Sequence, residues 1–252
     1  MHAAIFAAQE TCMRKLFFLL IAIAAASPSF SQNANPKKKF NLAGRPGDHI
    51  LLQLSSDRWM GAPDSIDSRR KSLSRGGNIY IMLDKPFKGS PRMSAAFGLG
   101  VGTSSMFFDK LLVDIAGNVP VLNFRSLDTL NRFKKYKVTT AYLELPVELR
   151  YTANPEKPNK TFKAAIGLKV GTLLKAQTKG KTLQDASGRN INDYTQKTSS
   201  KSYFNTTRLA ATARLGYGYF SLFGSYNITS IFKDGVAADM KPLQIGLTIS
   251  GL

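Results

Sequence analysis

Side chains with catalytic or metal-binding chemistry are scarce in this sequence. Its only cysteine is Cys12, and its histidines are His2 and His49. A transition-metal site needs several thiolate or imidazole ligands, and a serine hydrolase needs a histidine beside its nucleophile. No serine lies in a nucleophile-elbow motif, and the carboxylates are too scattered for a calcium loop. The sequence therefore predicts no catalytic, metal or cofactor-binding site and no enzymatic activity.

A second group of reactive side chains consists of charges that alternate with apolar residues. In the segment 142–151, Glu144, Glu148 and Arg150 occupy even positions, and apolar residues occupy every odd position. A helix would spread these charges around its surface, whereas a strand places them on one face. Downstream segments repeat the pattern, which predicts one inward-facing set of charges: Glu144, Glu148, Arg150, Lys163, Lys169, Arg208 and Arg214.

These inward charges are expected to pair with one another. An unpaired ion costs several kcal/mol to bury, even after the protein relaxes. We therefore expect Glu144 and Glu148 to pair with the cations Lys163, Lys169, Arg208 and Arg214. A structural role that holds a narrow lumen shut is the simplest interpretation. A lumen that conducts or binds a ligand is the alternative.

Alternation with a period of two residues is the dominant pattern after residue 48. It marks eight segments: 50–54, 79–83, 95–101, 142–151, 162–172, 208–217, 220–229 and 243–249. The links are alternately long and polar (59–76, 108–136, 175–202 and 232–241) or short and rich in turn residues (84–92, 152–160 and 216–218). Loop lengths sorted in this way are typical of outer-membrane barrels. The sequence predicts an all-β fold, an eight-stranded antiparallel up-and-down transmembrane β-barrel with short periplasmic turns and long outer loops.

The apolar face of the predicted strands suits a lipid environment. It is mostly aliphatic, and aromatic residues lie near the strand ends, where interfacial girdles are expected. The expected girdle residues are Trp59, Tyr142, Tyr151, Phe162, Tyr203, Phe204, Tyr217, Phe220 and Phe232. The alternative is a soluble periplasmic β-protein, such as a two-sheet sandwich, that binds a lipid or apolar ligand.

The N-terminal region has the three parts of a secretory signal peptide. Basic residues at 14–15 precede an apolar run at 16–26, and a small-x-small motif ends at Ser31. We expect translation to start at Met13 and cleavage to follow Ser31. Residues 32–47 are interpreted as a periplasmic tether and 48–252 as the barrel. The expected location is the outer membrane.

The chain is strongly basic, with 35 Lys and Arg residues against 16 Asp and Glu residues. For an exported chain without a nucleic-acid motif, we expect no nucleic-acid partner. Much of the charge lies in the predicted outer loops and forms a basic rim there: Arg125, Arg132, Lys134, Lys135, Lys179, Lys181 and Arg189. The rim either keeps the loops solvated or contacts outer-leaflet lipid such as lipopolysaccharide, or an acidic partner protein.

The segment Tyr142-Leu143-Glu144-Leu145-Pro146-Val147-Glu148-Leu149-Arg150-Tyr151 resembles the Tyr-x-Glu-x-Pro strand of the PorT-like outer-membrane β-barrel family of Bacteroidetes. The end of the signal peptide and the final segment, with Ile245-Gly246-Leu247, are similar to that family as well. The resemblance covers most of residues 48–252. It implies an eight-stranded barrel without enzymatic activity, and a link to protein secretion in some members.

Overall fold

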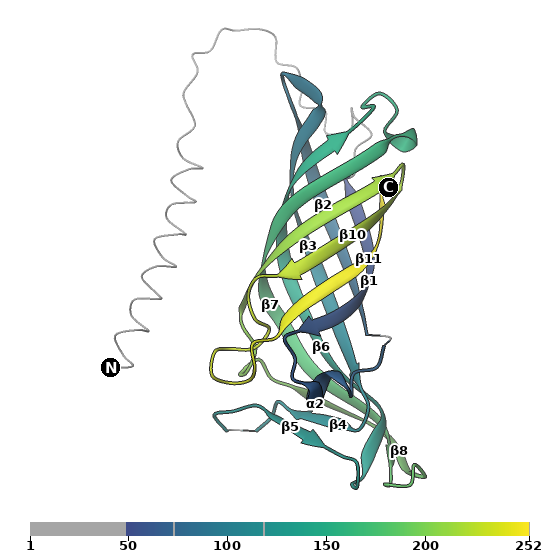
Figure 1. Cartoon of the computed structure of the whole chain (residues 1–252), viewed down its shortest axis with the longest axis vertical. Coiled ribbons are helices and arrows are strands. Elements are labelled where there is room, and N and C mark those ends of the chain that lie inside the picture. The colour runs from purple at the N-terminus through teal and green to yellow at the C-terminus, as the bar shows by residue number, and fades with distance from the viewer. Residues whose placement is uncertain (1–48, 73, 118, 252) are drawn as a thin grey trace, which may run out of the picture. The chain divides into compact units, whose positions relative to one another are not determined.

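The computed structural model describes residues 49–72, 74–117 and 119–251, and Figure 1 shows the arrangement of their strands. The expected signal peptide (1–31) and tether (32–47) lie outside these residues. Among the described residues, no helix has the length and apolar character needed to cross a bilayer.

Eight strands close into an antiparallel barrel, which confirms the predicted fold. They are β1 (Ile50–Met60), β2 (Arg75–Phe87), β3 (Ser90–Phe108), β6 (Arg132–Thr152), β7 (Phe162–Gln184), β9 (Thr207–Tyr217), β10 (Phe220–Asn227) and β11 (Lys241–Ser250). Neighbours in space follow the order β6-β3-β2-β1-β11-β10-β9-β7, and pairing between β6 and β7 completes the circle. Sequential strands therefore lie side by side, as in an up-and-down barrel.

The strands extend beyond the segments that alternation alone marks. The predicted turn at 84–92 shrinks to residues 88–89, because β2 and β3 continue into it. The predicted loop at 175–202 contains the end of β7 and a further strand, β8 (Asn190–Ser199), which pairs with β7. Polar residues occupy both faces of these extensions, so the apolar alternation that marks a lipid-facing strand is absent there.

The other long links also contain regular structure. The link between β3 and β6 folds into a hairpin of β4 (Leu111–Asp114) and β5 (Asn123–Ser126). The link between β1 and β2 contains the short helix α2 (Asp64–Asp67). The short link between β6 and β7 contains a 3₁₀ turn, η1 (Pro158–Lys160). In Figure 1, β4, β5, β8 and α2 all lie at the same end of the barrel.

The outward faces of the barrel strands are apolar and exposed. Leu145, Val147, Leu168 and Leu247 are each at least half exposed, although aliphatic side chains normally favour the interior. Because these side chains come from β6, β7 and β11, the apolar surface continues around the barrel. Such a surface is stable when hydrocarbon covers it, and a closed sheet leaves no backbone edge in lipid.

The expected aromatic girdle is only partly correct. Tyr151, Phe162, Tyr217 and Phe220 do point outward, near the short turns. The other expected girdle residues are buried inside the fold: Trp59, Tyr142, Tyr203, Phe204 and Phe232. Trp59 shares the inward face of β1 with Gln53 and Asp57, and Tyr142 shares that of β6 with Glu144. The face of the strand on which an aromatic residue lies therefore predicts its exposure better than its closeness to a strand end.

Pro146 interrupts the pairing of β6 with β3. The paired residues pass from Phe97 and Val147 directly to Gly100 and Glu144. Proline has no backbone N–H to donate, so a central strand can accept it only where the ladder is broken. The break lies between the two inward carboxylates of β6, Glu144 and Glu148.

We predict that Leu168→Arg destabilises the barrel by about 2–4 kcal/mol, because Leu168 is 50% exposed on the outer wall among aliphatic neighbours. The matched control is Gln177→Arg, on the same strand near the outer loops, where the cost falls to roughly 0–1 kcal/mol. Urea unfolding in lipid vesicles measures both. Equal costs at the two positions would show that this wall does not face hydrocarbon.

Candidate functional site

Glu144 is the centre of an ionic cluster inside the barrel. Its Oε1 lies 2.9 Å from Nη1 of Arg208, and its Oε2 lies 3.2 Å from Nζ of Lys169. The hydroxyl of Tyr80 donates a hydrogen bond to the same carboxylate. Glu144 is fully buried and Lys169 is 2% exposed. Two cations and a hydroxyl thus compensate a carboxylate that has lost its water.

Glycines on the same face make room for this cluster. A Cβ atom at Gly102 of β3 would lie 2.7 Å from Oε2 of Glu144, and one at Gly171 of β7 would lie 3.1 Å from its Cγ. Any larger residue at Gly102 would push against the carboxylate. The glycines therefore allow a long charged side chain to lie flat against the wall of a narrow barrel.

Glu148 forms a second cluster nearer the short turns. Its Oε2 lies 2.8 Å from Nε of Arg150 and 3.1 Å from Nη2 of Arg214. Arg150 Nη1 also lies 3.8 Å from Asp84, which accepts a hydrogen bond of 2.7 Å from Ser94. The expected pairing partners of Glu148 did not include Arg150 or a contribution from Asp84.

Amides connect the charges across the lumen. Gln244 of β11 accepts hydrogen bonds of 3.4 Å from Lys169 and 3.3 Å from Arg208. Its amide nitrogen donates to Asp57 of β1 at 3.1 Å, and Arg208 also donates to Asn227 at 2.9 Å. The connected polar groups therefore come from strands on opposite sides of the barrel. Connected hydrogen bonds of this kind polarise one another and strengthen the network.

The structure brings together nearly all the expected interior charges. Glu144 joins Lys169 and Arg208, whereas Glu148 joins Arg150 and Arg214. Lys163 is also buried on the inward face of β7. Tyr80 and Gln244 lie at inward positions of the predicted segments 79–83 and 243–249 but were not counted in the expected charge network. Asp57 and Asp84 lie just beyond the predicted segments 50–54 and 79–83.

Little space remains between the two ionic clusters. A cavity of about 20 Å³ lies among lumen residues that include Gln53, Tyr80, Glu148 and Lys169. That volume is close to the space needed for a single water molecule. Long side chains therefore fill this part of the lumen.

An apolar cluster occupies the lumen toward the long loops. We call it the plug, and its buried members are Trp59, Ile66, Met106, Phe108, Leu111, Val113, Ile115, Leu122, Tyr136, Val138, Tyr142, Leu173, Ala176, Tyr203, Phe204, Ile231, Phe232 and Met240. Trp59 contacts Phe108 and Phe232, with 5.5 Å between ring centroids in both cases. Every long link contributes residues to the plug, so these links are packed parts of the fold.

Tyrosine hydroxyls attach the β4–β5 hairpin to the plug. Tyr136 donates to the carbonyl of Val113 at 2.9 Å and accepts from its N–H at 3.1 Å. The hydroxyl of Tyr203 donates to the carbonyl of Gly117 and accepts from the N–H of Val119. Leu122 N–H donates to Val236 of the β10–β11 link at 2.9 Å. The hairpin therefore covers the mouth of the barrel.

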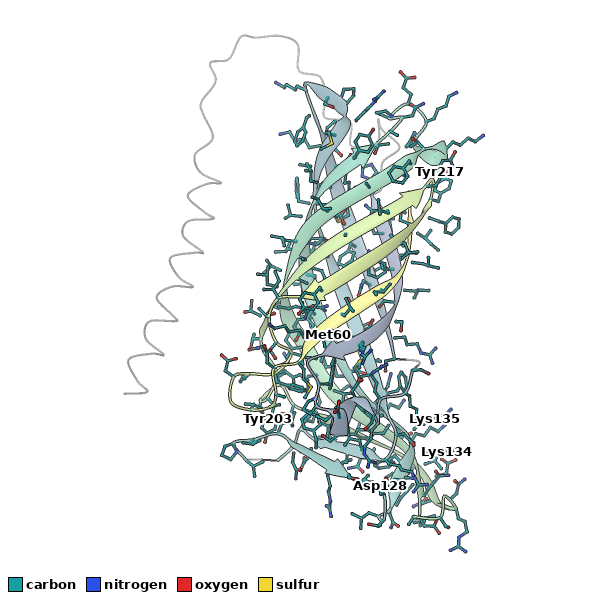
Figure 2. All side chains as sticks on the ribbon, viewed as in Figure 1. Met60, Asp128, Lys134, Lys135, Tyr203 and Tyr217 are labelled. Atoms are coloured by element: carbon teal, nitrogen blue, oxygen red, sulfur yellow. The ribbon has the colours of Figure 1, made fainter. Side chains whose placement is uncertain are left out.

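The residues of the basic rim all lie toward the loop end of the barrel, on β5, β6, β7 and the turn before β8. Figure 2 shows Lys134 and Lys135 there, far from Tyr217 near the short turns. Arg132 donates to the carbonyl of Ala186 at 3.0 Å, and Arg189 forms an ion pair of 3.0 Å with Asp185. Arg125 lies on β5 of the hairpin. The adjacent strands β6 and β7 contain Lys135, Lys179 and Lys181. Lys135 and Lys181 are directly opposite each other in the register of these strands.

Two loop carboxylates are held in the ionised form by their neighbours. Hydrogen bonds from Arg69 and Ser126 hold the pKa of Asp128 well below its usual range. Hydrogen bonds from Ser187 and the backbone and side chain of Arg189 lower the pKa of Asp185 to about 2. A carboxylate whose pKa is lowered in the folded state contributes stability that is lost only as the pH falls through that lowered pKa. The contacts of Asp128 and Asp185 with their neighbours therefore persist at neutral pH.

No group of three His, Cys, Asp or Glu side chains is arranged to hold a metal ion within the described residues. His49 lies at the start of β1, with Nδ1 3.3 Å from the carbonyl of Met82. The charged side chains of the lumen face one another, an arrangement that provides charge compensation.

We predict that Glu144→Gln destabilises the barrel by roughly 3–5 kcal/mol, because it leaves Lys169 and Arg208 buried without their shared carboxylate. The matched control is Glu156→Gln, at an exposed site between β6 and β7, with an expected effect within about 0.5 kcal/mol. Equilibrium unfolding of the refolded proteins in vesicles supplies both values. Similar values for the two variants would contradict a compensating role for Glu144.

Comparison with known proteins supports the fold and its location. No curated protein matches the sequence. The sequence model described as "Outer membrane protein beta-barrel domain" matches residues 30–233, which include all of the barrel except part of the β10–β11 link and β11. The match agrees with the closed sheet and its apolar outer wall. The chain therefore belongs to this family of outer-membrane β-barrel proteins.

Proposed function

We propose that this protein is a non-enzymatic outer-membrane barrel that acts through its outer surface, in a structural or interaction role. The observation that carries this proposal is the filled lumen. Two ionic clusters occupy the part of the lumen toward the short turns, and the plug occupies the part near the long loops. A lumen filled by side chains favours a role in which the protein makes its contacts from the outer surface over a role in solute passage.

The charge of the outer end supports contact with anionic material. Basic residues are spread over β5, β6, β7 and the turn before β8. They suit the phosphates of an outer-leaflet glycolipid or an acidic partner protein, since a cluster of cations raises the local concentration of anions. The scarcity of catalytic side chains in the sequence supports a non-enzymatic role.

The alternative of a periplasmic carrier for an apolar ligand is less well supported. Such a carrier would hold its ligand in an apolar lumen, whereas the lumen toward the short turns is charged here. The apolar concavity of about 820 Å³ among the described residues lies on the outer wall, where it is lined by Leu54, Ile79, Leu247 and neighbouring residues. In an outer-membrane barrel, acyl chains would cover that wall.

A place among the PorT-like barrels of Bacteroidetes, with a link to protein secretion, is a narrower proposal. It rests on the resemblance of the strand around Pro146, a residue that breaks the β3–β6 ladder. Export through a signal peptide cleaved after Ser31 belongs to the same proposal. Isolation from outer membranes with Gln32 at the N-terminus, together with a secretion component, would support it.

We predict that the protein inserted in planar bilayers gives no stable conductance steps, because side chains fill its lumen. Flotation with vesicles, followed by the gel-mobility shift of a folded barrel on heating, verifies insertion in the same preparation. The control is the protein unfolded before it is added to the bilayer. Reproducible steps of one size from the folded protein would contradict the proposal of a closed barrel.

A further inference from the structure

Four basic residues form a row across the outer wall near the long loops. Lys137 of β6 pairs with Lys179 of β7, and Lys179 pairs in turn with Lys197 of β8. On the other side of Lys137, Phe107 of β3 lies directly opposite it. Ser105, two residues before Phe107 and on the same face of β3, lies opposite Arg75 of β2. Residues directly opposite each other share a face of the sheet, so these side chains point the same way. We call Arg75, Lys137, Lys179 and Lys197 the basic row.

The basic row faces outward. The neighbouring residues of the opposite parity, Tyr136, Val138 and Ala176, are buried in the plug. From the short turns toward the row, the outward positions of β6 are Leu149, Val147, Leu145 and Leu143, followed by Ala141 and Thr139. The row therefore begins where the apolar wall ends, at the level expected for the headgroups of the outer leaflet.

The arrangement is costly without an anion. Like charges placed directly opposite each other destabilise a sheet, and the row contains two such pairs in succession. Lys135 and Lys181 form a further like-charged pair beside it. Among the described residues, none of these six side chains forms an ion pair with a carboxylate, although acidic residues neutralise Arg58, Arg69 and Lys71 nearby.

Other contacts hold the row in shape. Arg75 and Lys137 lie over the ring of Phe107, at 5.6 and 5.4 Å from its centroid. Lys137 Nζ is 3.3 Å from the hydroxyl of Ser105, which also lies 2.9 Å from that of Thr139. An aromatic ring and two hydroxyls at the edge of the apolar wall suit the boundary between acyl chains and headgroups.

We propose that the basic row binds the phosphate groups of an outer-leaflet glycolipid, whose acyl chains cover the apolar wall below. The inference rests on the proposed function and narrows it, because it assigns the glycolipid contact to the wall of β2, β6, β7 and β8. Phosphate oxygens between opposed lysines replace repulsion by charge-assisted hydrogen bonds. The sequence-based rim did not include Arg75 or Lys137, because the face that they share with Lys179 is set by the pairing of β2, β3, β6 and β7.

The test compares three triple variants, each of which removes three positive charges. The row variant is Lys137→Gln, Lys179→Gln and Lys197→Gln. The loop variant is Arg125→Gln, Lys134→Gln and Arg189→Gln. The control variant lies at the other end of the barrel, in the short turns, and is Lys88→Gln, Lys157→Gln and Lys160→Gln. The probe is lipid A with both phosphates, and its dephosphorylated form is the second ligand. Binding to the full-length mature protein in neutral detergent is measured across a salt series.

We expect the row variant to bind lipid A at least roughly tenfold more weakly than the wild type, with a smaller salt dependence. The control variant and the wild type should bind alike, and the dephosphorylated lipid should bind weakly to both. Without lipid, the row variant should melt at the same or a higher temperature than the wild type, because the repulsion is gone. That result also shows that it folds.

Three outcomes would overturn the inference. If the loop variant loses binding and the row variant does not, the glycolipid contact lies in the loops and the proposed function stands. If all three variants weaken binding equally, only net charge matters. If the wild type does not bind lipid A, the glycolipid contact of the proposed function fails as well. Should the triple variant fold poorly, Lys179→Gln alone, between two opposed lysines, must still weaken binding.

Discussion

The compensation of buried charge within the lumen is the constraint on which the rest of the structure depends. An eight-stranded barrel has an interior that side chains can just fill, and here many of those side chains are ionic. Glu144 is fully buried with Lys169 and Arg208, and Glu148 lies between Arg150 and Arg214. Each of these carboxylates has at least one cationic partner on another strand, Lys169 and Arg208 for Glu144 and Arg214 for Glu148. The ionic clusters therefore depend on the closure of the barrel, which brings these strands together.

The lumen is divided into two chemically different parts. The charged part lies within the strands whose outer faces are aliphatic, where the sheet alone separates it from lipid. The plug lies toward the long loops, where Tyr136 and Tyr203 attach the β4–β5 hairpin by their hydroxyls. A polar interior with an apolar cover leaves the outer wall and the loop surface as the parts that can meet other molecules. The positive charge is concentrated on those parts.

Much of the barrel could be predicted from sequence because its signal is local. In segments such as 142–151, alternation shows both the strand and the face of each residue, so the inward charges of β6, β7 and β9 follow directly. Other features of the structure leave no alternating pattern in the sequence and could not be predicted from it. β8 has no apolar face, and the aromatic residues Phe204 and Phe232 lie outside regular strands, so no periodicity indicated that they are buried. Asp57 and Asp84 were missed because the predicted strands were too short by a few residues.

If charge compensation holds the lumen together, the lumen charges must stabilise one another. A double-mutant cycle on Glu148 and Arg214 tests this most directly. The two residues belong to strands that are not neighbours in the sheet, β6 and β9, and Nη2 of Arg214 lies 3.1 Å from Oε2 of Glu148. Glu148→Gln, Arg214→Gln and the double variant are unfolded with urea in vesicles, and their free energies of unfolding are compared with that of the wild type. We expect a coupling free energy of about 1–3 kcal/mol between the two side chains. Additivity of the two single changes within about 0.5 kcal/mol would contradict it.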